Sequence, residues 1–495
     1  MESMERQVNP VIKDAVGGFE GRLITDARRD AESITSSLWD FGGQQVFYSM
    51  HHIFLTKSGV YVLVFDLRDL LQQEKGAVWL DYVSFWLGSI KLHAPTAPLL
   101  MVGTFLAENI TKDDLKRFDS IIQNVAKTKF SNIVRNTQDG LLFFPIDNRE
   151  RLGVFNLRTQ LEYTIREDES VRQEVTIKWM LFLDNILLKR TQVSYITLSE
   201  AREMAVDLGI TTISEQEQAL RLFHQRGALI HLTSTDILKN IIIIKPQWLI
   251  DSLGKIICDP GLHADVVEFK NVGLEDDFNS TFNDALTTRD FLDYIWQGEP
   301  IDFLVDLMKR TFLLSEWNFT QGEPRFLIPS LLRSTCPDEA RGIKCVFDFS
   351  KSFLPVGVFQ RLLCLCVAIA AKSKLRILEP ILFKDFCSIE LQQNSKINLK
   401  TELSNIILFV ENDKQSFRNF SIIQSMLRKI NVDVLGTGLE WSEYMEDPKT
   451  GKLFSQSVAK SNQLAPWYSN PEVTEEIKIA TVKNMELNSF LDNFQ

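Results

Sequence analysis

The residues of this chain that could do chemistry begin with a short run at Asp40. Asp40-Phe41-Gly42-Gly43 fits the pattern D-x-x-G, and Gln44 follows it directly. In a nucleotide switch, an aspartate at such a strand end reaches a magnesium ion, the glycine amide faces the terminal phosphate, and the glutamine orients water. The same run could instead be a tight turn whose glycines supply positive φ, so a catalytic and a structural interpretation both stand.

A phosphate cradle is the partner that such a switch needs, and the printed sequence offers none. The pattern G-x-x-x-x-G-K-[ST] does not occur in it. Backbone amides of that loop surround the phosphates, its lysine contacts the terminal oxygens, and its hydroxyl binds magnesium. Residues 17–23, GGFEGRL, contain glycines but lack the lysine and hydroxyl pair. We therefore expect this chain to hold no nucleotide and no metal.

The elements that must position the switch alternate between strands and helices over residues 1–150. The predicted strands are 34–41, 59–67, 97–105 and 140–148, and the predicted helices between them are 77–93 and 111–128. Strands separated by helices of this length predict a parallel, doubly wound sheet. Ligands bind outside the carboxyl ends of such strands. Trp39–Gln44 and Gly103–Ala107 both fall at this edge.

The chain beyond residue 190 has a different pattern. Two hydroxyl residues, each followed three positions later by glutamate, lie in 197–200 and 214–217 and predict helix starts. Strand-like runs at 227–232 and 240–246 follow these helices. Helix, helix and hairpin in this order predict a winged-helix half over 191–335, joined to the first domain by a linker helix in 151–190.

An α+β half is predicted for residues 336–438. It contains a strand-like run at 344–350 and an apolar helix at 356–372. This helix has more apolar residues than one face needs, so it could meet a partner or be buried on all sides. Residues 439–495 are acidic with little periodicity, and we expect a partly disordered tail.

Longer stretches carry a resemblance to a known family. The stretches LWDFGGQQVFYSMHHIFLTKSGVYVLVFDLRDLL, WLDYVSFWLGSIKLHAPTAPLLMVGT and LFFPIDN resemble the Ras-of-complex-proteins (Roc) domain of the Roco family. The stretches YITLSEAREMAVDLGI, IIIIKPQWLIDSLGKII, FLIPSLL and FDFSKSFLPVGVFQRLLC resemble its constant partner, the C-terminal-of-Roc (COR) domain. The resemblance implies a partial Ras-like G domain in 1–150 that lacks its phosphate loop, followed by a COR module.

The resemblance also assigns roles to particular residues, and the chain departs from several of them. It implies a switch formed by Asp40, Gly43 and Gln44, with Asp40 and Thr104 as nucleotide contacts. The threonine of the first switch aligns loosely with an alanine in Ala15-Val16-Gly17. At the strand end that reads guanine, Ala107 replaces the aspartate, and a polar-reading site loses most of its discrimination when its polar group goes. These roles are therefore expected to be vestigial.

The charge and apolar composition of the chain limit the classes of partner that it could bind. Acidic residues number 65 against 54 basic ones, giving a net charge of -11. This argues against a nucleic-acid partner, which needs a basic face, and against an acidic membrane surface. The longest apolar run, Leu362 to Ala371, is about half of the ~20 residues needed to span a membrane. The six cysteines show no metal spacing, so we expect reduced thiols and a cytoplasmic protein.

Two other groups of residues are weak candidates. His51-His52 are adjacent, and neighbouring histidines rarely bind one ion without further ligands. Arg361 could be an arginine finger, but a solvated or salt-bridged arginine is the simpler interpretation. His93 is expected at the edge of the core or in solvent.

The sequence thus predicts a signalling scaffold that acts through protein partners, with a degenerate G domain that does not turn over GTP. By resemblance, it is expected to form a homodimer through its COR module. The alternative is a fragment of a larger Roco GTPase that binds and hydrolyses GTP with magnesium and is kinase-linked in its full-length form.

Overall fold

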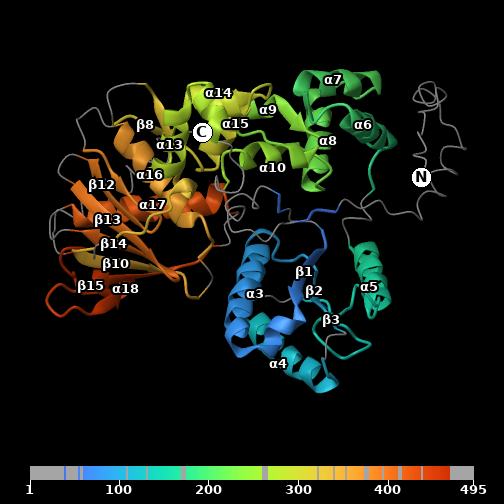
Figure 1. Ribbon diagram of the computed structural model, residues 1–495, viewed down its shortest axis with the longest axis horizontal. Helices are drawn as coiled ribbons and strands as arrows, with labels where there is room; N and C mark the ends of the chain where they lie inside the picture. The colour runs from blue at the N-terminus through green and yellow to red at the C-terminus, as the bar shows by residue number, and fades with distance from the viewer. Residues whose placement is uncertain are drawn as a thin grey trace, which may run out of the picture.

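The computed structural model has an N-terminal domain followed by three packed units (Figure 1). It describes residues 38–40, 54–55, 59–106, 110–129, 132–168, 174–258, 266–319, 323–337, 340–351, 354–372, 378–392, 395–410, 415–435 and 439–468. Among these, no helix is both long and apolar enough to cross a membrane.

The N-terminal domain is a three-stranded parallel sheet with helices on both faces. Its strands are β1 (Tyr61–Asp66), β2 (Leu99–Thr104) and β3 (Phe144–Pro145), in the order β1-β2-β3. After β1 comes the short helix η3 (Leu67–Leu71); α3 (Gln73–His93) and α4 (Lys112–Lys129) cover one face, and α5 (Val154–Glu167) covers the other. The parallel doubly wound arrangement predicted from the sequence is confirmed for these strands.

Two predictions about this domain need correction. Leu38–Asp40, part of the first predicted strand, lie outside any strand, and the rest of 34–41 lies outside the described residues. The single linker helix predicted in 151–190 is wrong. Val154, Leu157 and Leu161 of α5 pack against the apolar face of the parallel sheet, whereas Phe182 and Ile186 of the next helix are buried in the following unit. Each half of the segment therefore belongs to a different core.

The first unit (residues 177–257) surrounds a small antiparallel sheet. Its elements are α6 (Ile177–Leu188), η4 (Lys189–Thr191), β4 (Tyr195–Thr197), α7 (Leu198–Asp207), α8 (Ile213–Gln225), β5 (Ile230–His231), α9 (Asp236–Lys239), β6 (Ile241–Ile243) and α10 (Pro246–Gly254). The strand order is β4-β6-β5. The capping box predicted at 197–200 is present, because Thr197 and Glu200 each bind the other's backbone amide.

The second unit (residues 266–332) repeats this element order, which the sequence did not predict. Its elements are α12 (Val266–Asn271), α13 (Glu275–Asp284), β7 (Leu286–Thr288), α14 (Arg289–Ile295), α15 (Ile301–Arg310), β8 (Ser315–Trp317), β9 (Arg325–Leu327) and η5 (Pro329–Leu331). The strand order β7-β9-β8 is the counterpart of β4-β6-β5. The strands of this unit are not predicted from the sequence, because a strand of three residues gives too short a periodic signal.

Local contacts show how closely the two units correspond. Thr288 caps α14 through its side chain as Thr197 caps α7. Directly after the last strand, the amide of Ile244 donates a hydrogen bond to the backbone oxygen of Ser194 in the first unit. In the second unit, the amide of Ile328 donates to the backbone oxygen of Ala285. Two residues after α8 the backbone turns through Gly227 at φ 65°, and two residues after α15 it turns through Phe312 at φ 54°. Glycine favours this backbone conformation. Because the second unit has phenylalanine at the equivalent turn, the repeat is not visible in the sequence.

The C-terminal unit (residues 340–468) is a seven-stranded sheet with two long helices. The strands are β10 (Ile343–Asp348), β11 (Ile381–Leu382), β12 (Phe386–Gln392), β13 (Ser395–Glu402), β14 (Asn405–Val410), β15 (Ser442–Glu446) and β16 (Leu453–Ser455). Their order is β11-β12-β13-β14-β10-β15-β16, with antiparallel pairs throughout. The helices are α16 (Val358–Ala371), α17 (Ser416–Asp433) and the short α18 (Gln456–Ser461).

The apolar helix α16 is buried on all sides, which decides between the two interpretations left open by its sequence. It contacts β8 and η5 of the second unit as well as β12 and α17 of its own unit. Because these neighbours surround it, every residue from Arg361 to Val367 is buried. Its surplus of apolar residues therefore serves the core of the chain and leaves no apolar face for a partner.

Residues 439–468 of the predicted acidic tail are ordered as part of the C-terminal unit. The strand β15 pairs with β10 and with β16 in the seven-stranded sheet, and Trp467 is fully buried. The indole nitrogen of Trp467 donates to the backbone oxygen of Glu446 at 3.1 Å, and its ring meets that of Phe420 edge-on. In β15 the buried Met445 lies beside the charged Glu443 and Glu446, so the acidic composition of the segment concealed a strand.

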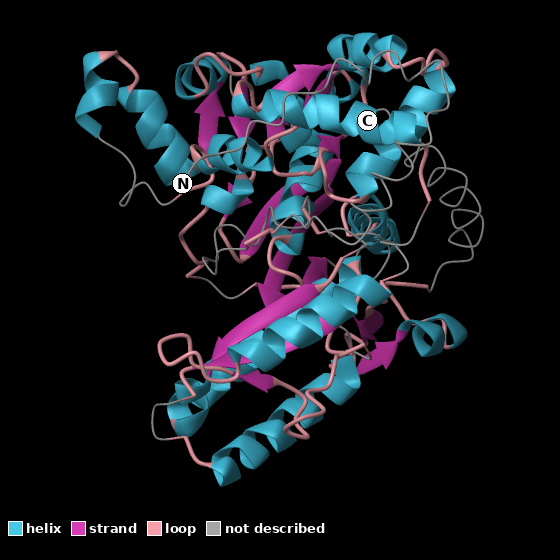
Figure 2. Ribbon diagram, turned by 90° about the vertical axis from the view of Figure 1, so that its right-hand side faces the viewer, coloured by secondary structure: helices cyan, strands magenta, loops and turns pink. Residues whose placement is uncertain are grey.

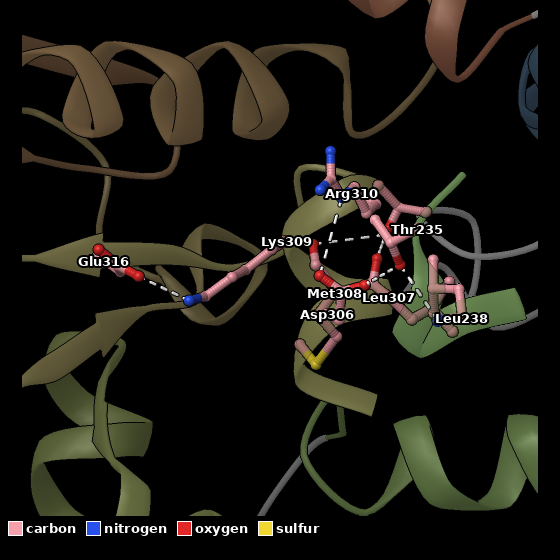
Figure 3. A network of polar contacts seen from close by, with 9 residues as sticks. Thr235, Leu238, Asp306, Leu307, Met308, Lys309, Arg310 and Glu316 are labelled. Carbon is pink, nitrogen blue, oxygen red and sulfur yellow. Dashed lines mark hydrogen bonds and ion pairs between the residues drawn. The ribbon is translucent and has the colours of Figure 1, made fainter. Parts of the chain in front are cut away.

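The outer face of each small sheet is covered by a helix of the next unit. Ile230 and Ile243 of the first unit share a continuous core with Leu307 and Met308 of α15. Figure 3 shows the polar contact beside this junction, where the hydroxyl of Thr235 donates to Asp306 at 2.5 Å. In the same way, β8 of the second unit is covered by α16. Figures 1 and 2 show the resulting stack of units above the N-terminal domain.

Two tryptophans lock the first and second units together. The indole nitrogen of Trp248 in α10 donates to Glu299 at 2.7 Å, and that of Trp296 donates back to the oxygen of Ser252 at 2.7 Å. Both rings are buried, at 8% and 0% exposure. A buried indole N–H without a partner is destabilising, so these reciprocal bonds fix one relative position of the two units.

Replacing Trp467 by alanine is expected to destabilise the C-terminal unit by about 3–5 kcal/mol, because it removes a buried indole and leaves a cavity. Urea unfolding followed by circular dichroism measures this loss. Tyr163→Ala is the control, since that ring is 61% exposed, and its effect should stay within about 0.5 kcal/mol. Equal midpoints for the two variants would contradict a core role for the segment beyond residue 438.

Candidate functional site

The candidate site is the carboxyl edge of the parallel sheet, where α/β proteins bind ligands. The side chain of Asp66, the last residue of β1, caps η3 by accepting from the amide of Arg68 at 2.8 Å. The same carboxylate also receives the guanidinium of Arg68, with Nη2 to Oδ2 at 2.8 Å and Nε to both oxygens at 3.1 Å. The planar cation is thereby held in one orientation.

Phe105 lies beneath this cation at the end of β2. The carbon at the centre of the Arg68 guanidinium is 3.6 Å from the centroid of the Phe105 ring. Phe105 has a φ of 64°, a region that costs a non-glycine residue of order 1–3 kcal/mol. The cation–π contact is worth about 0.5–1 kcal/mol at an exposed site. Strain, aromatic ring and cation are thus concentrated at one edge of the sheet.

The polar groups at this edge are engaged with one another or with the backbone. The hydroxyl of Thr104 donates to the oxygen of Phe65 at 3.1 Å, across the β1–β2 pair. The amide of Leu106 donates to Ile146, and the amide of Ile146 donates to Gly103, which ties β2 to β3. Within the described part of the edge, the chemistry available is cation presentation and stacking, and no His, Cys or carboxylate cluster suited to a metal is found there.

Gly103 is required by packing one residue before this edge. A Cβ at this position would meet Cδ2 of Leu67 at 2.5 Å and Cγ at 2.8 Å, distances that real atoms do not adopt. Leu67 is fully buried at the start of η3. The glycine therefore lets η3 turn back across β2, which places Arg68 over Phe105.

The structure separates the residues that the sequence had grouped. Asp40 is exposed, and its neighbour Trp39 packs against Phe54 with ring centroids 5.7 Å apart. Gly43 and Gln44 lie outside the described residues, as does Ala107. Thr104 lies at the carboxyl edge as predicted. The nucleotide-contacting roles that the resemblance assigns to these residues therefore stay predictions.

Sequence reasoning missed Asp66 and Arg68, although the signal was present. Both fall in VFDLRDLL, directly after a predicted strand, where an aspartate two residues before an arginine can cap a turn and pair with it.

Comparison with known proteins agrees with this fold. The family profile described as Ras of Complex, Roc, domain of DAPkinase matches residues 10–106. The profile described as C-terminal of Roc, COR-A domain, matches residues 176–332. The probable serine/threonine-protein kinase pats1 of Dictyostelium discoideum is 30% identical over 368 residues. The chain belongs to the Roco family.

The relatives that this Roco chain matches are much longer than the matched region. The match to pats1 covers 69% of this chain and 10% of that protein. The probable serine/threonine-protein kinase roco5 of the same organism is 26% identical, over 51% of this chain and 9% of that protein. The chain therefore spans about a tenth of the length of these relatives. A solved structure, Methanosarcina barkeri Roco2 RocCORdC bound to GDP, is 19% identical with a TM-score of 0.41, covering 65% of this chain and 91% of that one.

Gly103→Ala is expected to destabilise the N-terminal domain of this Roco chain by about 1–3 kcal/mol, the usual cost of overpacking. Leu67→Ala removes the atoms that the new Cβ would meet, so the double variant should lose less stability than the sum of the two single variants. Thermal unfolding of the two single variants and the double variant gives the coupling between the positions. Strictly additive effects would show that the two residues do not constrain each other.

Proposed function

We propose that this Roco chain is a signalling scaffold whose G domain is degenerate and does not turn over GTP. The observation that carries the proposal is the edge of the parallel sheet. There Arg68, held by Asp66, stacks 3.6 Å above Phe105. The printed sequence supports it further, because no phosphate-loop pattern occurs and Ala107 stands where the resemblance expects the base-reading aspartate.

A second candidate function is that of a segment of a larger Roco GTPase. The observation that favours it is coverage, since pats1 and roco5 are about ten times longer than the part that this chain matches. In that setting, GTP binding and hydrolysis would use a phosphate loop supplied by additional sequence, and a linked kinase would be regulated by it. The coding sequence upstream of Met1 distinguishes the two proposals.

The finer fold of the COR module is part of the proposal. We infer that the first and second units are both of winged-helix type, because each has the order helix, strand, two helices, two strands with the last strand central. Protein contact is the proposed role of both units. Charge is balanced over α8 and its C-terminal cap, with Glu215 and Glu217 against Arg221 and Arg226, whereas a helix that reads DNA carries a basic excess.

We propose that the chain forms a homodimer through the COR module, with a contact surface that does not include α16. Exposed apolar side chains lie beside the edge strand β11, where Leu378 is 76% and Ile381 55% exposed. An unpaired edge strand offers backbone groups to a second copy, and two-fold dimers are the commonest oligomers. We place the proposed dimer contact at this edge.

The first expected outcome is the absence of nucleotide binding. Calorimetric titration of the chain with GTP, GDP or ATP in the presence of magnesium should show no heat of binding at micromolar concentrations, since the loop that makes most phosphate contacts is lacking. Asp40→Ala serves as the control. Micromolar affinity, or any GTPase activity that Asp40→Ala removes, would refute the degenerate-domain proposal and support the GTPase alternative.

The second expected outcome concerns assembly. Sedimentation velocity at low micromolar concentration should show a dimer, and Leu378→Asp with Ile381→Asp should convert it to a monomer by placing charges in an apolar contact. Leu403→Asp is the matched control, because Leu403 is equally apolar and fully exposed in the β13–β14 turn. A monomeric wild-type chain would remove dimerisation from this proposal.

A further inference from the structure

A buried cation in α16 is the feature that the proposed function does not use. The side chain of Arg361 is 2% exposed, and nothing in the neighbouring sequence indicates this burial. Burial lowers its pKa to about 10, so the guanidinium is still charged at neutral pH. An ion this deep requires compensation from fixed dipoles or charges.

One source of compensation is the end of α15 in the second unit. The Nε of Arg361 donates to the backbone oxygen of Thr311 at 3.1 Å. Thr311 is the residue that caps the carboxyl end of α15. The carboxyl end of a helix carries a partial negative charge and unpaired carbonyl oxygens, so it favours a cation.

The end of α3 in the N-terminal domain also reaches this region. The last residue of α3 is His93, and the charge of Arg361 reaches it. Leu92, the residue before it, is buried in the core shared by the second unit and the C-terminal unit, although the rest of α3 packs on its own sheet. Figure 1 shows one end of α3 directed toward those units. The carboxyl end of α3 therefore enters the same core as α15 and α16, within reach of the charge of Arg361.

We propose that Arg361 is the joint that fixes the orientation of the N-terminal domain, because the carboxyl end of α15 accepts a hydrogen bond from its guanidinium and the carboxyl end of α3 enters the same core. The interaction surface is thus formed by three parts of one chain: α3, α15 and α16. Guanidinium suits this position because its five N–H groups can reach several carbonyl oxygens at once, and because it is more weakly hydrated than the ammonium of a lysine.

The state of His93 is consistent with this geometry. Burial, and then the positive charge of Arg361, lower the pKa of His93 to about 4. His93 is therefore neutral beside the cation at neutral pH, so that like charges do not meet at the joint. In the folded chain it binds a proton only well below pH 6.5, whereas the unfolded chain binds one near pH 6.5. Stability supplied by this group thus rises with pH between about 4 and 6.5 and is lost as pH falls through that range.

Hydrogen exchange of the full chain tests the joint directly. Arg361→Met keeps the length of the side chain and removes its charge and its donors. We expect amide exchange in the last turn of α3 (residues 90–94) and in residues 312–314 to accelerate about tenfold or more, since local opening there becomes easier. Exchange in α4 and in α17 should keep the wild-type rate. Arg428→Met, an exposed arginine of α17, is the matched control and should change neither region.

The outcomes separate a joint from a merely structural arginine. Unchanged exchange at 90–94 in Arg361→Met would overturn the proposal. Equal acceleration in α4 and α17 would also overturn it, because that result means general loss of stability. Arg361→Lys should restore part of the protection at both helix ends, since it keeps the charge with fewer donors.

A titration of His93 provides a readout that packing alone would not change. With ¹³C-labelled histidine, and with His93→Gln to identify the signal, the wild-type His93 resonance should stay constant from pH 8 down to about pH 5, given its pKa of about 4. In Arg361→Met the resonance should begin to move above pH 5, because the repelling charge is gone. Identical titration curves in the two proteins would show that the guanidinium does not act on α3.

Discussion

A guanidinium buried without exposure to water constrains the arrangement of this chain more than any single apolar contact. Arg361 lies on a helix surrounded by the second unit, the large sheet and α17. Removing a cation from water costs several kcal/mol unless dipoles replace the water. The carboxyl end of α15 supplies such a dipole, and we propose that the end of α3, which enters the same core, supplies a second from a different part of the chain. The core can thus form fully only when these parts are together.

The units follow a simple rule of burial around that point. Each three-stranded sheet packs one face on its own helices and offers the other to the next unit. The run of isoleucines at 241–244 shows the consequence, because Ile242 and Ile244 face the helices of the first unit while Ile243 faces the second. A strand buried on both faces needs apolar residues throughout. The C-terminal unit ends the series with a sheet whose core is closed by Trp467.

The candidate site lies at the other end of the N-terminal domain, away from this stack. It combines a strained backbone at Phe105 with the stacked cation of Arg68. An arginine that is paired with a carboxylate and stacked on a ring is already satisfied, and its placement depends on a glycine that lets η3 cross β2. A scaffold whose sheet edge is already occupied and whose units are rigidly joined would hold its partners in fixed positions and would not catalyse a reaction. This fits the function proposed for this Roco chain.

The sequence by itself determined the parallel sheet, the helices on its faces, the apolar strands of the C-terminal unit and the Roco resemblance. These features rest on periodicities and on runs of residues that act locally. The repeated unit at 266–332, the order in 439–468, and the burial of α16 were decided by tertiary structure. Three-residue strands are stable only when neighbouring units cover them, and a charged strand such as β15 is ordered by its pairing with β10. Asp66, Arg68 and Phe105 form one site only because β1 and β2 lie side by side. Arg361 could not be placed for the same reason, because the helix ends that stabilise its charge are far from it in the sequence.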